Sequence, residues 1–145
     1  MEFFREVTPL RSEDLFVILD SVNNGFDYPI HNHKEFELNL IMGTEGTRIV
    51  GDSIERFSDF DLVLLGPYLL HKWEDSKSAR ESNKKYRVIT LQFDIDLFSM
   101  DTFSKACFQK MRTLLEKSRR GVCFNEETTM KAIPILIRMT DQDDF

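Results

Sequence analysis

The first two thirds of the chain consist of short apolar runs separated by turn residues. Runs rich in Val, Ile, Leu and aromatic residues cover 15–19, 36–42, 48–50, 61–65 and 86–93. The breaks between them, at 23–25, 43–46, 51–52 and 66–67, all contain glycine. Many short strands at close spacing are typical of an all-β sandwich or barrel. The polar stretch 74–85 is predicted to be an exposed loop.

From about residue 100 the pattern becomes helical. Apolar side chains recur there at three- and four-residue steps, namely Phe103, Cys107, Met111 and Leu114. Gly121 is suited to end that helix, and a short extended link follows at 122–124. Asn125 is a suitable N-cap for a second helix, whose apolar stripe is Ile133, Leu136 and Ile137. Pro134 predicts a kink or a break in it.

Length and charge limit the classes of function. The 145 residues fit one domain, with a barrel in 1–98 and a helical segment in 99–145. The net charge is −6, and no run of Lys and Arg alternates with aromatic residues. The electrostatic footprint of a DNA-binding protein is therefore missing, and any contact with DNA would need another segment.

Cysteine usage and the start of the chain predict a cytoplasmic protein. Cys107 and Cys123 form no CxxC pair, so a zinc ribbon is not supported, and two buried thiols in a reducing cytosol are the simpler interpretation. The first residues lack a basic start followed by an apolar run, which argues against a signal peptide. No apolar stretch approaches the length of a membrane span, so we expect no membrane contact.

One segment combines two kinds of side chain at alternating positions. Side chains on a strand alternate between faces, which would place the odd positions together and the even positions, Phe36, Leu38, Leu40 and Met42, on an apolar face. The odd positions are mostly ionisable or polar: His31, His33, Glu35, Glu37 and Asn39. Two histidines and a carboxylate at this spacing can converge inside a barrel, with His71 from a later strand as a fourth group. Imidazole and carboxylate both suit a divalent transition metal.

These residues resemble the first cupin motif, G-x5-HxH-x3,4-E-x6-G. Gly25, His31, His33, Glu37 and Gly43 match it, with the last spacing one residue short. The second cupin motif, G-x5-PxG-x2-H-x3-N, is matched only at Pro67 and His71. Phe60 or Asp61 replaces its first glycine, Leu69 its second, and Asp75 stands where asparagine is usual. The resemblance covers about residues 15–95. It implies a mainly β protein, a cupin-type double-stranded β-helix (jelly-roll barrel) followed by two or three C-terminal α-helices.

A narrower resemblance is to the N-terminal cupin domain of AraC-type transcription regulators. It rests on the sequence pattern of residues 31–52 and 61–73 and on the order of the predicted elements, in which the barrel comes before the helices. It implies that the barrel binds a small effector, often a sugar or related metabolite, that the helices support a homodimer, and that a separate C-terminal helix-turn-helix domain binds DNA. Nothing after residue 100 is long or basic enough to be that domain. We therefore predict an isolated sensor domain and not an enzyme.

The predicted ligand-binding residues are His31, His33, Glu35, Glu37, Asn39, Arg48, Tyr68, His71 and Trp73. Four of them, His31, His33, Glu37 and His71, are the candidate ligands of a metal. The alternative is that these groups line an effector pocket without metal. Trp73 could stack on a sugar or belong to the core, and Arg48 could form a surface salt bridge instead. An error in strand register would reverse all of these positions together.

Two other functions remain open. A metal-dependent cupin enzyme (a dioxygenase, decarboxylase or isomerase) would use the same four ligands with open positions for substrate. A plain carbohydrate-binding module is the other. The apolar face of residues 36–42 needs a cover, which we expect from the helix at 103–115. The stripe of Ile133, Leu136 and Ile137 is then predicted to pair with a second copy, unless both helices pack on the barrel.

Overall fold

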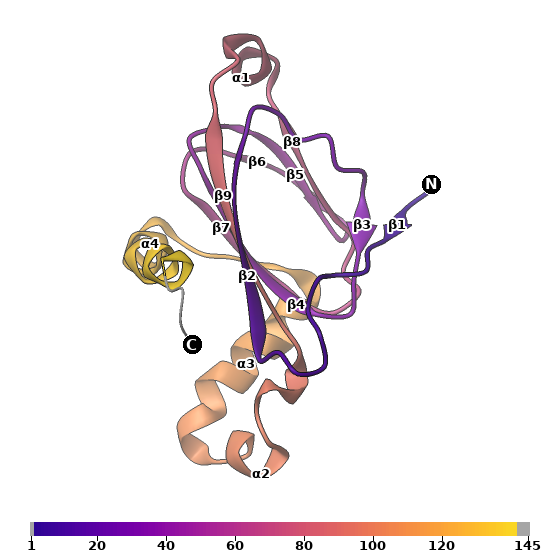
Figure 1. The fold of residues 1–145 in the computed structure, drawn as a ribbon, viewed down its shortest axis with the longest axis vertical. Coiled ribbons are helices and arrows are strands. Elements are labelled where there is room, and N and C mark those ends of the chain that lie inside the picture. The colour runs from indigo at the N-terminus through magenta and orange to yellow at the C-terminus, as the bar shows by residue number, and fades with distance from the viewer. Residues whose placement is uncertain (1, 142–145) are drawn as a thin grey trace.

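Two facing β-sheets form the body of the protein, and the helices lie outside them (Figure 1). The structure is a computed structural model that describes residues 2–141. Sheet A has the strand order β1-β3-β8-β5-β6, and sheet B has the order β10-β7-β4-β9-β2. The strands of sheet A are β1 (Phe4–Arg5), β3 (His31–Asn32), β8 (His71–Asp75), β5 (Gly46–Val50) and β6 (Ser53–Phe57). The strands of sheet B are β10 (Val122–Cys123), β7 (Asp61–Leu65), β4 (Phe36–Met42), β9 (Tyr86–Phe93) and β2 (Phe16–Asn23).

This topology confirms the predicted fold class, a mainly β cupin-type jelly roll followed by helices. Every strand pair is antiparallel except β1 with β3. The predicted strands at 36–42, 61–65 and 86–93 coincide with β4, β7 and β9. The short polar strands β3 and β8 were expected only through His31 and His71, and β6 was not predicted, because these sequences lack the apolar runs that mark a strand. Backbone pairing with neighbours holds them in the sheet.

The segment 31–41 is not one strand, which corrects the alternation expected from the sequence. His31 lies on β3 in sheet A, directly opposite His71 on β8. The chain then crosses to sheet B, where β4 starts at Phe36. The alternation holds only within β4. There Glu37 and Asn39 face the cavity described below, while Leu38 and Leu40 belong to the clusters against the helices.

The helical regions differ from expectation in three places. The predicted loop at 74–85 contains the end of β8 and a helix, α1 (Lys77–Ser82). The helix predicted from Phe103 is interrupted, and the Arg112 guanidinium bonds the carbonyl oxygens of Phe103 and Lys105 at the break. The helical elements of this region are η1 (Ile95–Leu97), which precedes the predicted helix, and then α2 (Met100–Phe103), η2 (Ala106–Phe108), α3 (Gln109–Lys117) and η3 (Ser118–Arg120). The last helix, α4 (Glu126–Thr140), runs without a break through Pro134.

The predicted helix ends are confirmed. Gly121 follows η3 with φ of 81°, a left-handed conformation that glycine adopts without strain. The side chain of Asn125 accepts a hydrogen bond from the backbone N–H of Thr128 at 2.9 Å and so caps α4. The predicted helical segment reaches residue 145, and its last four residues lie outside the described part of the chain. No helix within residues 2–141 is both long and apolar enough to span a membrane. Cys107 and Cys123 are both exposed, which corrects the expectation of buried thiols.

Both apolar stripes of the helical segment pack on sheet B. Leu115 of α3 belongs to one cluster with Phe36 and Leu64. Leu136 of α4 belongs to another with Leu40 and Ile89, and Ile133 and Ile137 pack against it. The stripe predicted to pair with a second copy is therefore covered within the chain. Packing on both sides of Pro134 also explains why α4 continues through it, since burial of the stripe outweighs one missing backbone hydrogen bond.

Candidate ligand and metal site

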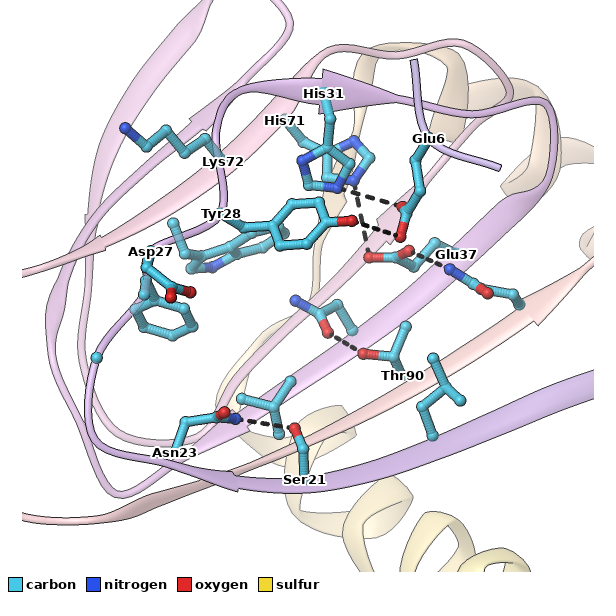
Figure 2. A pocket seen from close by; sticks show the side chains of 17 residues that line it. Glu6, Ser21, Asn23, Asp27, Tyr28, His31, Glu37, His71, Lys72 and Thr90 are labelled. Atoms are coloured by element: carbon cyan, nitrogen blue, oxygen red, sulfur yellow. Dashed lines mark hydrogen bonds and ion pairs between the residues drawn. The ribbon is translucent and has the colours of Figure 1, made fainter. Parts of the chain in front are cut away.

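A cavity of about 250 Å³ lies between the two sheets. Figure 2 shows its lining, to which sheet B contributes side chains of β2, β4 and β9, and sheet A contributes those of β3 and β8. The segment 25–28, which links β2 to sheet A, also contributes to the lining. The cavity is thus formed by residues from widely separated parts of the sequence.

Three histidines meet at one end of this cavity. His31 and His71 are direct neighbours across β3 and β8, with ring centroids 4.2 Å apart. His33 lies in the crossover between the sheets and is fully buried. One ligand atom from each of the three lies within 4.8 Å of the others. The cross-strand pairing of β3 with β8 is what unites residues forty positions apart in sequence.

Backbone carbonyl groups set the orientation of all three rings. Nδ1 of His31 contacts the carbonyl oxygen of Pro29 at 2.8 Å, that of His33 contacts Glu35 at 3.1 Å, and that of His71 contacts Leu69 at 2.8 Å. A carbonyl oxygen only accepts, so each Nδ1 carries the hydrogen. A neutral ring then has its lone pair on Nε2, and this tautomer is usual for histidines that bind metal through Nε2.

Glu37 adds a carboxylate to the histidines. Its Oε2 lies 2.9 Å from Nε2 of His33 and accepts a hydrogen bond from Nε2 of Gln92 at 3.0 Å. Its Oε1 lies 3.8 Å from Nε2 of His71. In the described residues, Nε2 of His71 is buried and has no hydrogen-bond partner. The lone pairs of the Glu37 carboxylate and of Nε2 of His71 therefore face each other, and a cation between them would bind both groups.

The charges of these groups follow from burial and from each other. Burial lowers the pKa of His71 to about 4, so this ring is neutral. Burial disfavours the charged form of His33 as well, but the hydrogen bond and charge of Glu37 outweigh it and raise the pKa of His33. Burial would raise the pKa of Glu37, yet the bond to His33 and the nearby imidazoles lower it to about 2. Glu37 is therefore an anion at neutral pH.

The rest of the cavity combines neutral polar groups with an aromatic wall. The hydroxyl of Thr90 donates to Oδ1 of Asn39 at 2.8 Å, and Ser21 lies further along the same side (Figure 2). Trp73 and Phe26 supply the apolar wall. The indole Nε1 of Trp73 donates to the carboxylate of Asp61 at 3.1 Å, which fixes the ring.

The structure brings together only some of the predicted site residues. His31, Glu37, Asn39, His71 and Trp73 line the cavity, and His33 lies behind it against Glu37. Three other predicted ligand-binding residues, Glu35, Arg48 and Tyr68, do not line it.

The surroundings of each of these three residues explain why its side chain does not line the cavity. Glu35 precedes β4 and is buried, with its carboxylate beside Nδ1 of His33. Arg48 is also buried, and its guanidinium bonds the buried Asp61 at 2.6 Å and the exposed Glu55 at 2.7 Å, so it forms the salt bridge given as the alternative. Tyr68 is exposed in a turn with φ of 60°.

Several lining residues escaped the sequence analysis. Thr90 and Gln92 lie on the predicted strand 86–93 directly opposite Asn39 and Glu37, and identifying them requires the register between β4 and β9. Tyr28 occupies an unspecified position of the first cupin motif, between Gly25 and His31. Glu6 belongs to a segment without a motif and reaches the site only because β1 pairs with β3. No sequence signal would have found Glu6.

The double-sheet topology and the histidine cluster between the sheets define a cupin-type barrel. No protein-family model matches the sequence, and no curated protein matches it. Among solved structures, the chain is similar to a cupin 2 conserved barrel domain protein from Rhodopseudomonas palustris, with 13% identity, a TM-score of 0.45 and 72% of each chain covered. It is also similar to a cupin-2 domain from Rhodospirillum rubrum, with 9% identity, a TM-score of 0.46, and coverage of 76% of this chain and 75% of that one.

Proposed function

We propose that this barrel is the ligand-sensing domain of an AraC-type transcription regulator and that it binds a small, hydroxyl-bearing molecule such as a sugar or related metabolite. The observation that carries the proposal is the cavity, in which hydroxyl and amide groups face an aromatic wall. Its volume of about 250 Å³ is small for a ligand site and suits a molecule of few atoms. Trp73 supplies a flat surface on which a sugar ring can stack.

The charges of the lining favour a neutral ligand. Glu6, Asp27 and Glu37 contribute carboxylates, whereas Lys72 is the one Lys or Arg among the lining residues that the structure describes. An anionic ligand would meet unfavourable charges from these three carboxylates. Asn39 and Thr90 already bond each other, and their remaining donor and acceptor capacity is available to hydroxyl groups.

A divalent transition metal fits the histidine end of the cavity. The fit rests on the buried, unpartnered Nε2 of His71 and on the three Nδ1 groups held by backbone carbonyls. His31, His33, His71 and Glu37 would hold the ion, and Gln92 would orient Glu37 by its hydrogen bond. When bound, the metal would act as a Lewis acid toward an oxygen of the ligand. Neutral imidazole and carboxylate donors suit first-row metals such as iron, manganese, nickel or zinc.

A row of polar contacts offers a route for a signal from the cavity to the last helix. Trp73 in the cavity wall bonds Asp61, and Asp61 bonds Arg48. The guanidinium of Arg48 also lies 3.2 Å from Sγ of Cys123 on β10, two residues before the cap of α4. A ligand that moves the Trp73 ring would disturb these contacts and change the population of α4 conformations.

Thermal unfolding with a panel of neutral sugars, polyols and the matching sugar acids tests the binding proposal. A neutral ligand at one hundred times its Kd should stabilise the protein by about 2.7 kcal/mol and be recovered unchanged. Asn39→Ala should abolish the stabilisation, while Tyr68→Phe, outside the cavity, should retain it. Hydrogen exchange should show a ligand-dependent change in 126–140. Absence of stabilisation by every neutral compound, or a preference for the acids, would refute the proposal.

A metal-dependent cupin enzyme is the second candidate, and the convergence of one potential ligand atom from each of three histidines favours it. This function predicts that protein loaded with iron, manganese, nickel or zinc converts a compound from the same panel or consumes oxygen with it. NMR of the reaction mixture detects a product directly. Turnover that disappears in His71→Ala would establish an enzyme, and binding without turnover would support the sensor.

A further inference from the structure

We propose that Glu6, from the segment preceding the barrel, is an additional carboxylate donor to the metal and that Tyr28 orients it. The inference rests on the metal site proposed above. Figure 2 shows Glu6 next to His31, with Tyr28 directed at its carboxylate. Glu6 is not part of the histidine and Glu37 motif that the sequence identifies.

Backbone pairing fixes Glu6 beside the histidines. The N–H of Phe4 donates to the carbonyl of Ile30 at 2.9 Å, and the N–H of Glu6 donates to that of Asn32 at 2.8 Å. These two bonds flank His31 and hold β1 parallel to β3. Alternation then directs Phe4 and Glu6 to the side of Tyr28, whereas the Arg5 guanidinium lies 5.3 Å from the ring centroid of Tyr68.

The Glu6 carboxylate faces Nε2 of His31, and a cation bound between the two groups would make this arrangement favourable. Its Oε2 lies 3.7 Å from Nε2 of His31. Since Nδ1 of His31 donates to the carbonyl of Pro29, Nε2 is an acceptor whenever the ring is neutral, and two acceptors do not bond each other. The same arrangement recurs between Glu37 and His71 at 3.8 Å. A metal ion bound by the imidazoles would satisfy both carboxylates.

Charge balance supports the same assignment. The side chain of Glu6 is only 21% exposed, and within residues 2–141 no Lys or Arg forms an ion pair with it. A divalent ion held by neutral imidazoles and Glu37 alone would leave one positive charge uncompensated in a largely buried site. Glu6 would remove that charge, which is favourable where solvent screening is weak.

Tyr28 is a positioning residue in this arrangement. Its hydroxyl donates to Oε1 of Glu6 at 3.2 Å, which leaves Oε2 directed at His31. Its ring also packs edge-on against His31, with centroids 4.8 Å apart. Tyr28→Phe keeps the ring contact and removes only the hydrogen bond.

Cobalt(II) titration of the full chain, followed by calorimetry and by the visible absorption of the bound ion, tests the proposal. Glu6→Gln should weaken cobalt(II) binding by about tenfold or more and alter the absorption band, because water replaces a carboxylate. Tyr28→Phe should shift the same band with a smaller loss of affinity. Asp27→Asn is the matched control, since it removes one carboxylate from the same cavity away from the histidines.

The outcomes separate this inference from the metal proposal itself. Wild-type protein that binds no cobalt(II) overturns both. Wild-type binding with an unchanged affinity and spectrum in Glu6→Gln overturns the role of Glu6 and leaves the histidine site intact. Equal losses in Glu6→Gln and Asp27→Asn would show a general effect of charge and would also overturn it. Unfolding temperatures in the presence of a chelator verify that all variants fold.

Discussion

Arg48→Met would break a buried ion pair next to the cavity. Arg48 and Asp61 are each less than 10% exposed, and their side chains meet at 2.6 Å. Without the guanidinium, the Asp61 carboxylate keeps the bond from Trp73 but has no buried cation beside it. Removing one partner of a buried pair costs about 3–5 kcal/mol. For a chain of this size, that corresponds to a fall in Tm of roughly 6–20 °C.

Calorimetry on the wild type and Arg48→Met measures this loss, and a double variant identifies its cause. In Arg48→Met/Asp61→Asn no charge is buried, and the amide oxygen still accepts from Trp73, so most of the stability should return. Burial raises the pKa of Asp61 despite its bonds to Trp73 and Arg48. A raised pKa in the folded state means that stability falls as pH rises, so the defect of Arg48→Met should be smallest below pH 3.8.

Two results would refute this reasoning about Arg48. A loss below about 1 kcal/mol, the size expected of a surface ion pair, would show that Arg48 is not acting as a buried partner. A double variant no more stable than Arg48→Met would show that the unpaired Asp61 charge is not the cause. Ligand binding should survive in the double variant, because Arg48 does not line the cavity.

Three further variants test the packing around the site, each by thermal unfolding. Asp20→Asn removes a two-bond contact with a partly exposed Arg87 and should cost about 0.5–1 kcal/mol. The Arg87 bond lowers the pKa of Asp20, so the difference from wild type should be present above pH 3.8 and vanish as pH falls further. Gly46→Ala would place a Cβ atom 1.9 Å from the carbonyl oxygen of Glu74. The variant should lose about 1–3 kcal/mol or more of stability, because β5 and β8 must move apart. A variant as stable as the wild type would contradict this close approach of the two strands. Leu136→Ala should cost about 2–5 kcal/mol, and a much smaller loss would mean that α4 does not pack on sheet B.

The sequence predicted those residues of the candidate site that the cupin motif or the alternation of side chains along a strand identifies. His31, Glu37 and His71 were found because cupin spacing marks them, and Asn39 because it follows Glu37 on the same face of β4. Glu35 was included for the same reason, but the chain changes sheets before β4 and the alternation does not extend to it. Gln92 required knowledge of the β4–β9 register, which the sequence of either strand alone does not contain.

The sequence by itself determined the type of most local structure: apolar strands, a helical C-terminal segment, and Gly121 and Asn125 at helix ends. These features depend on neighbouring residues, so local pattern suffices. Only the tertiary structure decided that Arg48 bonds Asp61, that the stripe of α4 is covered by sheet B, and that Glu6 lies beside His31. Such contacts join residues far apart in the chain, and pairing between strands and burial of whole faces, not local sequence, determine which of them form.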